Sequence, residues 1–228
     1  MALLHTLIRR LRRRGALPQN APHKAAPPLT PALERRIRDS FDEAAADEEH
    51  FPATVDPRLE HVRLLVREFT PLGAPRIADI GCGKGRFARV LAGEIPGARL
   101  VCSDVSLKML AHVRPPFSAC AASMTALPFA DGSFDAAYAI ESLEHAVDIA
   151  AATAHICRIV RPGGRIVFID KNAEHWGRLQ TPEWERWFSR GELEALLARS
   201  CRRVRSQPIS YWADVEPDGM FLAWIAER

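Results

Sequence analysis

The sequence predicts an α/β fold with a mostly parallel β-sheet and helices on both of its faces. Short apolar runs of strand length alternate with helical segments through the middle of the chain, which is typical of parallel sheets. The 228 residues, 47% of them hydrophobic, suit one globular domain of roughly 200 residues with a small extension. The charged fraction of 26% is that of an ordinary soluble chain.

Two helices are predicted before the first strand. Leu33, Ile37 and Phe41 recur at every fourth position, and the helical pattern continues to about residue 49. A second helix is expected over residues 57–69, because its apolar residues gather on one side and a stretch rich in proline and glycine follows it.

Apolar runs mark the strands of the expected sheet. The clearest strands are predicted at residues 76–80, 99–102, 134–140 and 165–169, with a weaker one at 117–121. Helices are predicted at residues 86–92, 107–112, 149–160 and 190–200. Two last strands, 203–210 and 220–226, are joined by the turn Pro217-Asp218-Gly219, which predicts an antiparallel pair at one edge.

The positive charge of the chain is concentrated in its first residues. Residues 1–33 hold six Lys and Arg and no Asp or Glu, whereas the remainder holds 25 Lys and Arg against 28 Asp and Glu. Residues 1–30 are therefore predicted to be a basic amphipathic helix and a proline-rich linker, and residues 31–228 the globular domain. Such a helix could lie on an anionic membrane surface, or it could be a terminus with no role of its own.

Other bulk features exclude several classes of protein. A nucleic-acid-binding core should carry its own basic surface, so the acidic balance after residue 33 disfavours nucleic acid as a partner. The sequence contains no run of about 18 apolar residues, which predicts no membrane-spanning helix. Five widely spaced cysteines without a Cys-x-x-Cys pair disfavour a disulfide framework and a thiolate zinc site. We therefore expect a cytoplasmic protein that could touch the inner membrane surface through residues 1–14.

The loop after the first predicted strand is rich in glycine. Gly81, Gly83 and Gly85 alternate there, so the backbone can turn tightly and approach a ligand next to the following helix. A dinucleotide fingerprint has glycine where Arg86 stands, and a phosphate loop has Ser or Thr after its lysine, so neither pattern fits. Asp104 ends the next strand about 20 residues further on, a spacing at which a carboxylate can bind a ribose hydroxyl.

Two further motifs complete an ordered set. They are Leu127-Pro-Phe-Ala-Asp131-Gly-Ser-Phe-Asp135 and Arg161-Pro-Gly-Gly164. With them, about residues 41–205 resemble the class I S-adenosylmethionine-dependent methyltransferases, in particular methyltransferase type 11 and the ubiquinone-pathway O-methyltransferases. The resemblance implies a Rossmann-like, doubly wound, seven-stranded sheet with an antiparallel edge strand. It also implies methyltransferase activity of residues 31–228, with S-adenosyl-L-methionine as the cofactor.

The resemblance implies which residues surround the cofactor. Asp79 and the three glycines would surround its methionine part, Asp104 would hold the ribose, and Met109 would pack near the adenine. The family commonly has aspartate where Ser123 stands, and a serine hydroxyl accepts a hydrogen bond more weakly. Asp79 could instead cap the following turn, and Met109 could belong to the core. The residues expected to bind the cofactor are Asp79, Gly81, Gly83, Gly85, Asp104, Met109, Ser123, Met124 and Glu141.

The chemistry is expected at the carboxyl end of the fourth strand, because open α/β sheets place ligands there. The sequence at this point, Glu141-Ser-Leu-Glu144-His145, looks like that of ubiquinone-pathway O-methyltransferases and of small-RNA 2′-O-methyltransferases that bind a divalent metal. We expect His145 and Glu144 to be catalytic, with His145 removing a proton from a hydroxyl acceptor. A divalent metal on Glu141, Glu144 and His145, with His175 as a further ligand, is an alternative that we do not favour.

The acceptor is expected to be a small molecule, with an oxygen of a quinone-like or lipid-associated compound as the methylated atom. Trp176, Trp184 and Trp187, with Lys171 and Arg178, could bind a flat or anionic acceptor. Ordinary core packing is the more economical explanation of Trp187, Phe188 and Trp224. A lid over the cofactor is expected from Phe41 to Phe51. The alternatives are an RNA methyltransferase that uses the arginines of the first residues, and a cofactor-binding module without catalysis.

Overall fold

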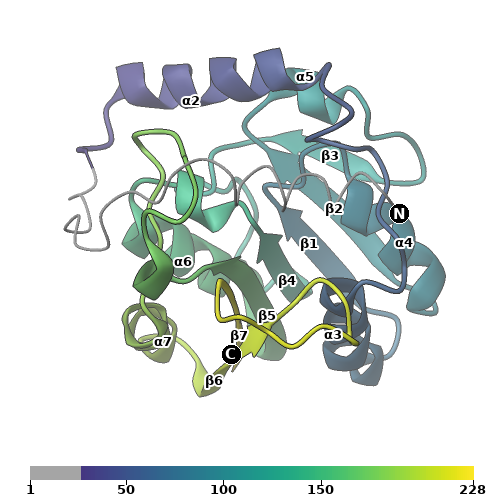
Figure 1. Ribbon diagram of the computed structural model, residues 1–228. Helices are drawn as coiled ribbons and strands as arrows, with labels where there is room; N and C mark the ends of the chain where they lie inside the picture. The colour runs from purple at the N-terminus through teal and green to yellow at the C-terminus, as the bar shows by residue number, and fades with distance from the viewer. Residues whose placement is uncertain (1–26) are drawn as a thin grey trace.

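The computed structural model describes residues 27–228 of the chain. Within these residues the strands form one seven-stranded sheet in the order β3-β2-β1-β4-β5-β7-β6 (Figure 1). The strands are β1 Arg76–Ile80, β2 Arg99–Asp104, β3 Ser118–Ala121, β4 Phe134–Ile140, β5 Val160–Lys171, β6 Arg202–Ile209 and β7 Phe221–Glu227. Only β7 runs against its neighbours, between β5 and β6, and the strands from β1 to β5 pair in parallel. The predicted α/β sheet with an antiparallel pair at one edge is confirmed.

Helices cover both faces of the sheet. The helices are α2 Pro31–Ala44, α3 Glu60–Phe69, α4 Arg86–Glu94, α5 Leu107–Leu110, α6 Ile149–Ile159 and α7 Arg190–Ala198, with short 3-10 turns at Thr70–Leu72, Leu143–His145 and Ala173–His175. One core packs α3 and α4 against the sheet, and a second packs α6 and α7 against its other face. Both faces of the central strands are therefore buried, which explains why β4 is apolar over nearly its whole length.

Two boundaries differ by about five residues from those that the periodicity predicts. The first helix ends at Ala44 rather than near residue 49, because the Asp47 side chain accepts hydrogen bonds from the backbone of Glu49 and His50 and forms a turn. The strand β5 begins at Val160, five residues early, since Gly164 lies against β4. A Cβ at Gly164 would stand 2.5 Å from the Asp135 carbonyl oxygen.

Helix α2 lies across the carboxyl ends of the parallel strands (Figure 1). Thr30 caps it, and its Asp42 carboxylate accepts a hydrogen bond of 2.5 Å from the Ser106 hydroxyl beside α5. At its other end, Ile37 packs with Val147 and Trp184 in a small core separate from the two main ones. Three elements that are distant in sequence therefore hold α2 over the end of the sheet.

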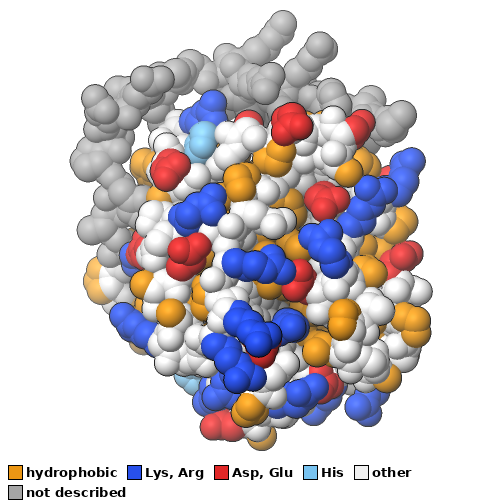
Figure 2. Space-filling view, turned by 90° about the horizontal axis from the view of Figure 1, so that it is seen from below, with side chains coloured by type: hydrophobic (Ala, Val, Ile, Leu, Met, Phe, Trp, Pro, Cys, Tyr) orange, Lys and Arg blue, Asp and Glu red, His pale blue; other side chains and the backbone are white. Residues whose placement is uncertain are grey.

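The opposite pole of the molecule carries many Lys and Arg side chains (Figure 2). Three arginines, Arg165, Arg202 and Arg203, form ion pairs there with Glu227 near the end of β7. The predicted amphipathic helix and most of the predicted linker lie outside the described residues. Across residues 27–228, no helix combines the length and the apolar character that crossing a membrane requires.

Candidate active site

A cavity of about 630 Å³ opens between α2 and the carboxyl ends of β1, β2 and β4. Its volume lies in the range of small-molecule sites. The residues expected at the site that line it are Asp79, Gly81, Gly83, Asp104, Met109, Ser123, Met124, Glu141 and His145. In the described part of the chain, Gly85 and Glu144 are the two expected residues that do not line it.

The glycine loop owes its shape to left-handed backbone at Gly81, Gly83 and Gly85. Gly81 has φ +69°, and a Cβ there would lie 2.5 Å from the Ser142 Cβ, so the loop can pass the end of β4 only as glycine. Gly85 has φ +75° and is the N-cap of α4. A Cβ on Gly85 would meet Val113, and Gly85 does not line the cavity, so this glycine shapes the backbone of the loop.

Asp104 ties the glycine loop to the end of β2. One carboxylate oxygen accepts a hydrogen bond of 2.8 Å from the Gly83 backbone, and the other accepts one of 2.8 Å from the Ser106 backbone. Burial raises the pKa of Asp104 above its usual value, although these hydrogen bonds favour the carboxylate. The same side chain also borders the cavity.

Asp79 lies at the end of β1 and is almost completely buried, with 3% of its surface exposed. Its Oδ2 atom has no hydrogen-bond partner within residues 27–228. Burial is the main reason why the pKa of Asp79 is raised to about 7. A buried, unpartnered acceptor in a cavity wall is the kind of atom that a ligand donor group satisfies.

Three expected residues form a less polar part of the cavity wall. Met109 on α5 is buried, with 2% of its surface exposed. The Ser123 hydroxyl forms a hydrogen bond of 2.7 Å with the Thr125 hydroxyl, and Met124 lies close to Gly81. Ser123 therefore already has a polar partner of its own.

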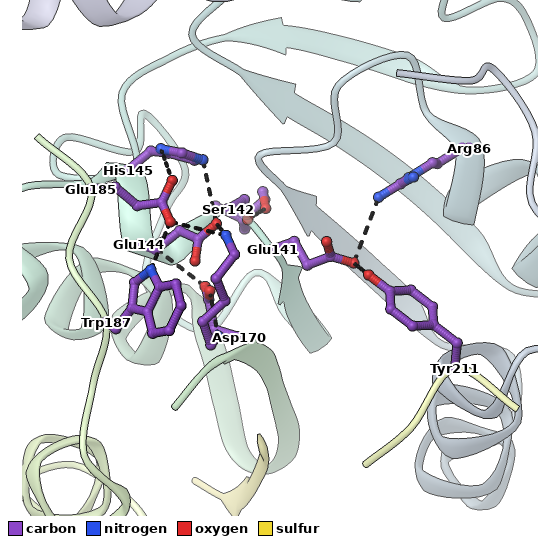
Figure 3. A network of polar contacts seen from close by, with 11 residues as sticks. Arg86, Glu141, Ser142, Glu144, His145, Asp170, Glu185, Trp187 and Tyr211 are labelled. Carbon is purple, nitrogen blue, oxygen red and sulfur yellow. Dashed lines mark hydrogen bonds and ion pairs between the residues drawn. The ribbon is translucent and has the colours of Figure 1, made fainter. Parts of the chain in front are cut away.

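Glu141 begins the turn after β4 with φ +50°, an uncommon conformation for a residue with a side chain. Its carboxylate accepts a hydrogen bond of 2.7 Å from the Tyr211 hydroxyl and lies 4.0 Å from the Arg86 guanidinium (Figure 3). Burial opposes ionisation of Glu141, but Arg86 and its other neighbours outweigh burial, so its pKa is lowered. The sequence analysis missed Tyr211, which follows β6, because no motif surrounds it.

Glu144 lies on the other side of the same turn and is 1% exposed. Lys171, at the end of β5, contacts the Glu144 carboxylate and reaches Glu185 at 3.0 Å. The Glu144 backbone N–H donates to Asp170, and Trp187 donates its indole N–H to Glu185 at 2.7 Å (Figure 3). Burial raises the pKa values of Glu144 and Asp170, and it raises that of Glu185 to about 7.

His145 stands between this cluster and the cavity. Its ring packs edge-on against Phe41 of α2, with 5.0 Å between the ring centres. Its Nε2 atom lies 3.5 Å from Glu144, and its Nδ1 atom lies 4.0 Å from Glu185. Burial, and then Lys171, lower the pKa of His145 to about 3, so the imidazole is neutral at physiological pH.

The metal alternative assigned the ligands to Glu141, Glu144 and His145. The structure groups Glu144 and His145, with Glu185 in place of Glu141. Possible ligand atoms of Glu144, His145 and Glu185 lie within 4.8 Å of one another. Glu141 is bound to Tyr211 instead, and His175 lies beside Gly219. Because the Lys171 ammonium already contacts both carboxylates of the group, a metal ion would have to displace it.

The tryptophans do not form the expected acceptor wall. Trp187, Phe188 and Trp224 are fully buried, which confirms the core-packing explanation, and Trp184 packs under α2. Among the described residues that line the cavity, the aromatic side chains are Phe41, Phe51 and Phe87. Sequence reasoning favoured the tryptophan-rich segment because aromatic composition alone does not distinguish a core from a wall.

Comparisons with known proteins agree with this geometry. Residues 78–168 match the family model described as a methyltransferase domain. The demethylmenaquinone methyltransferase of Renibacterium salmoninarum is 32% identical over 174 residues, which are 72% of this chain and 70% of that protein. The O-methyltransferase cnsE of Penicillium expansum is 36% identical over 115 residues, 46% of this chain and 41% of that protein.

A solved S-adenosylmethionine-dependent methyltransferase from Mesorhizobium loti shares the fold. Its TM-score is 0.59 at 24% identity, over 74% of this chain and 97% of that one. Together with the sequence matches, this similarity shows that the chain belongs to the class I S-adenosylmethionine-dependent methyltransferases, with S-adenosyl-L-methionine as cofactor. The resemblance seen in the sequence is thereby confirmed. The chain spans 39% to 46% of the length of the first O-methyltransferases that it matches.

Proposed function

We propose that this protein transfers a methyl group from S-adenosyl-L-methionine to a hydroxyl oxygen of a small, largely apolar acceptor. A quinone-like or lipid-associated hydroxyl compound is the acceptor that we favour. The observation that carries the proposal is the position of the neutral His145 imidazole at a cavity whose other walls hold the cofactor-type residues. A relative named O-methyltransferase supports oxygen as the methylated atom. Relatives named demethylmenaquinone methyltransferase support a quinone-like acceptor.

The residues of the cavity fit the cofactor. The unpartnered Asp79 oxygen suits the ammonium group of the methionine part, and Gly81 and Gly83 line the cavity with it. Asp104 suits the ribose hydroxyls, since a carboxylate can accept hydrogen bonds from both. We assign Met109, Ser123 and Met124 to the adenine, and Glu141 to the wall beside the methionine part.

The bound cofactor supplies an electrophilic methyl group, and the chain has to align the acceptor and exclude water. Helix α2 places Ile37 and Phe41 over the cavity, where Phe51 and Phe87 add to the apolar wall. The charged residues of α2 that also line the cavity are Glu34, Arg35 and Arg38. His145 borders the same cavity, and its unprotonated ring can accept the proton of an acceptor hydroxyl. Glu144 does not reach the cavity, so we assign it to the surroundings of His145.

The RNA alternative has less support. An RNA acceptor needs basic side chains for its phosphates, and residues 31–60, which include the helix over the cavity, hold nine Asp and Glu against four Arg. Of the basic residues that line the cavity, Lys84 and Arg86 already face Glu48 and Glu141. Many other Lys and Arg side chains lie at the opposite pole (Figure 2). A purely regulatory cofactor-binding module would leave the placement of His145 at the cavity without a purpose.

We also propose the division into a basic segment, residues 1–30, and a catalytic domain, residues 31–228. In this proposal the basic segment brings the enzyme to anionic membranes, near lipid-associated acceptors. Sedimentation with vesicles of phosphatidylglycerol and phosphatidylcholine should retain the full chain far better than residues 31–228. Equal retention would contradict the membrane role and leave the catalytic proposal intact.

The pocket assignment is tested by replacing Asp104 with alanine. Loss of the carboxylate should weaken cofactor binding about 100-fold or more, because charge-assisted hydrogen bonds to the ribose are removed. Calorimetry with S-adenosylhomocysteine measures the affinity, with Asp218→Ala as an exposed control. Unchanged affinity in the Asp104 variant would refute the assignment.

Oxygen methylation is tested by a separate experiment. The wild type is incubated with methyl-labelled cofactor and a panel of catechols and naphthohydroquinones, and mass spectrometry identifies the methylated products.

A further inference from the structure

The inference concerns the buried side of the His145 ring, and it rests on the proposed oxygen methylation. His145 Nδ1 is buried and has no hydrogen-bond partner among residues 27–228. The group that faces it is the Glu185 carboxylate, whose Oε2 atom lies 4.0 Å away (Figure 3). We infer that Glu185 is a positioning residue that holds His145 as the Nδ1–H tautomer, so that Nε2 presents its lone pair to the acceptor hydroxyl.

The other contacts of Glu185 orient its carboxylate for this role. Its Oε1 atom accepts hydrogen bonds from the Trp187 indole at 2.7 Å and from Lys171 at 3.0 Å. Both donors therefore bind the same oxygen, Oε1, and the other oxygen, Oε2, faces the imidazole. A separation of 4.0 Å is longer than a hydrogen bond, and such contacts commonly shorten when a ligand fills the site.

Glu144 is less suited to this function. It lies 3.5 Å from Nε2 rather than Nδ1, and the oxygen that faces the ring, Oε1, is the one that Lys171 contacts. The charged or titratable groups around the ring are Glu144, Asp170, Lys171 and Glu185. Of these, Glu185 has a carboxylate oxygen turned to the buried nitrogen, as in other carboxylate–histidine pairs.

Glu185 and His145, called the dyad from here on, account for the proton that the reaction releases. The acceptor oxygen forms its bond to the methyl carbon while the sulfur–methyl bond breaks, and S-adenosylhomocysteine leaves as a neutral thioether. The hydroxyl proton passes to His145 Nε2. Glu185 stabilises the resulting imidazolium through Nδ1–H, and the proton is released to water when the product leaves.

Glu185→Gln is the informative variant. Trp187 and Lys171 both donate to Oε1, so the amide oxygen of the new side chain should stay with them and the amide NH₂ should face Nδ1. An N–H that faces Nδ1 favours the opposite tautomer, with the proton on Nε2. The matched control is Glu174→Gln, an exposed glutamate in the same connection whose side chain lies 3.5 Å from the Asn172 amide.

The first test needs no acceptor. Nitrogen-15 NMR of the full chain with S-adenosylhomocysteine bound, with the signals of His145 identified by their loss in His145→Gln, should show the proton on Nδ1. Glu185→Gln should move it to Nε2, and Glu174→Gln should not. A wild-type ring protonated on Nε2, or a tautomer unchanged in Glu185→Gln, would overturn the inference. A carboxylate with a merely structural role would not move the tautomer.

The second test measures turnover with whichever phenolic probe the labelled-cofactor panel shows to be methylated. Glu185→Gln should lower kcat about 100-fold or more with little change in KM for the cofactor, and Glu185→Asp should recover part of it. Glu174→Gln should keep the wild-type kcat. If NMR finds the Nδ1–H tautomer but no hydroxyl probe is methylated, the proposed function fails and the dyad stands. Normal kcat in Glu185→Gln would contradict the dyad alone.

Discussion

Two glutamates three positions apart at the end of β4 have opposite surroundings. Glu141 points toward Tyr211 and Arg86, and Glu144 lies beside Asp170 (Figure 3). The Glu144 carboxylate contacts Lys171. Burial disfavours the charge on both side chains, yet the pKa of Glu141 is lowered and that of Glu144 is raised. The neighbours of each carboxyl therefore decide its protonation, and not its depth alone.

The numbers of acids and bases explain the difference. On the Glu141 side, one carboxylate has two partners, the Arg86 guanidinium and the Tyr211 hydroxyl. On the other side, one ammonium, Lys171, serves three carboxyl groups, and two of them contact it directly. A cluster with more acids than bases retains protons, which suits a site that has to handle a proton during turnover.

The largest effect is expected from Lys171→Met, which removes the ammonium that contacts Glu144 and Glu185. Buried carboxylates would then face one another without a cation, so the free energy of unfolding at pH 8 should fall by about 3–5 kcal/mol. Urea unfolding measures it, with the exposed Lys108→Met as control. The loss should shrink at pH 5, because the carboxyls can bind protons there. An equal loss at both pH values would contradict the electrostatic explanation.

A smaller effect is expected in the pH dependence of stability. The folded-state pKa of Glu185 is about 7, above the ordinary value of 4.5, so the folded protein binds the extra proton. The stabilisation is complete below the ordinary pKa and is lost as the pH rises through 7, with a size on the order of 3 kcal/mol. Glu185→Gln should flatten the urea-unfolding profile between pH 4.5 and 7.5.

Glu141 supplies the opposite control. Its folded-state pKa is lowered, so its contribution is present above the ordinary value and is lost as the pH falls through the folded-state value. In Glu141→Gln, the free energy of unfolding should therefore fall less steeply as the pH is lowered below the ordinary pKa of glutamate. If both variants changed the same limb of the profile, the contrast between the two sides would be wrong.

The smallest effect is expected from Tyr211→Phe, which removes one hydrogen bond to Glu141. The free energy of unfolding should fall by about 1 kcal/mol, because Arg86 still faces the carboxylate. A double-mutant cycle with Glu141→Gln should give a coupling energy of similar size. Coupling near zero would show that the phenol hydroxyl contributes nothing to this carboxylate.

The sequence predicts best what depends on nearby residues. The glycine loop and Asp104 follow from the geometry of a strand, a turn and the next strand, so their positions at the cavity could be expected. The β1 and β4 boundaries agree with the apolar runs for the same reason. Strands and turns are determined by residues that are close together in the sequence, so a short motif is enough to predict them.

The partners of these residues could not be predicted in the same way. Glu185 and Tyr211 reach the end of β4 from 44 and 70 positions away from Glu141, through connections without regular structure. Glu144 was expected at the cavity because it adjoins His145, but the 3-10 turn at Leu143–His145 directs the two side chains differently. Tertiary packing decides such contacts, and a single sequence does not encode their pairing in any short motif.

The separate small core under α2 has a consequence for how ligands exchange. Ile37, Val147 and Trp184 hold this helix without joining either main core, so lifting it exposes far less apolar surface than opening the sheet. Local opening free energies scale with such surface, and α2 should detach long before the domain unfolds. Because the helix covers the cavity, we expect one opening event to free both products of the proposed reaction.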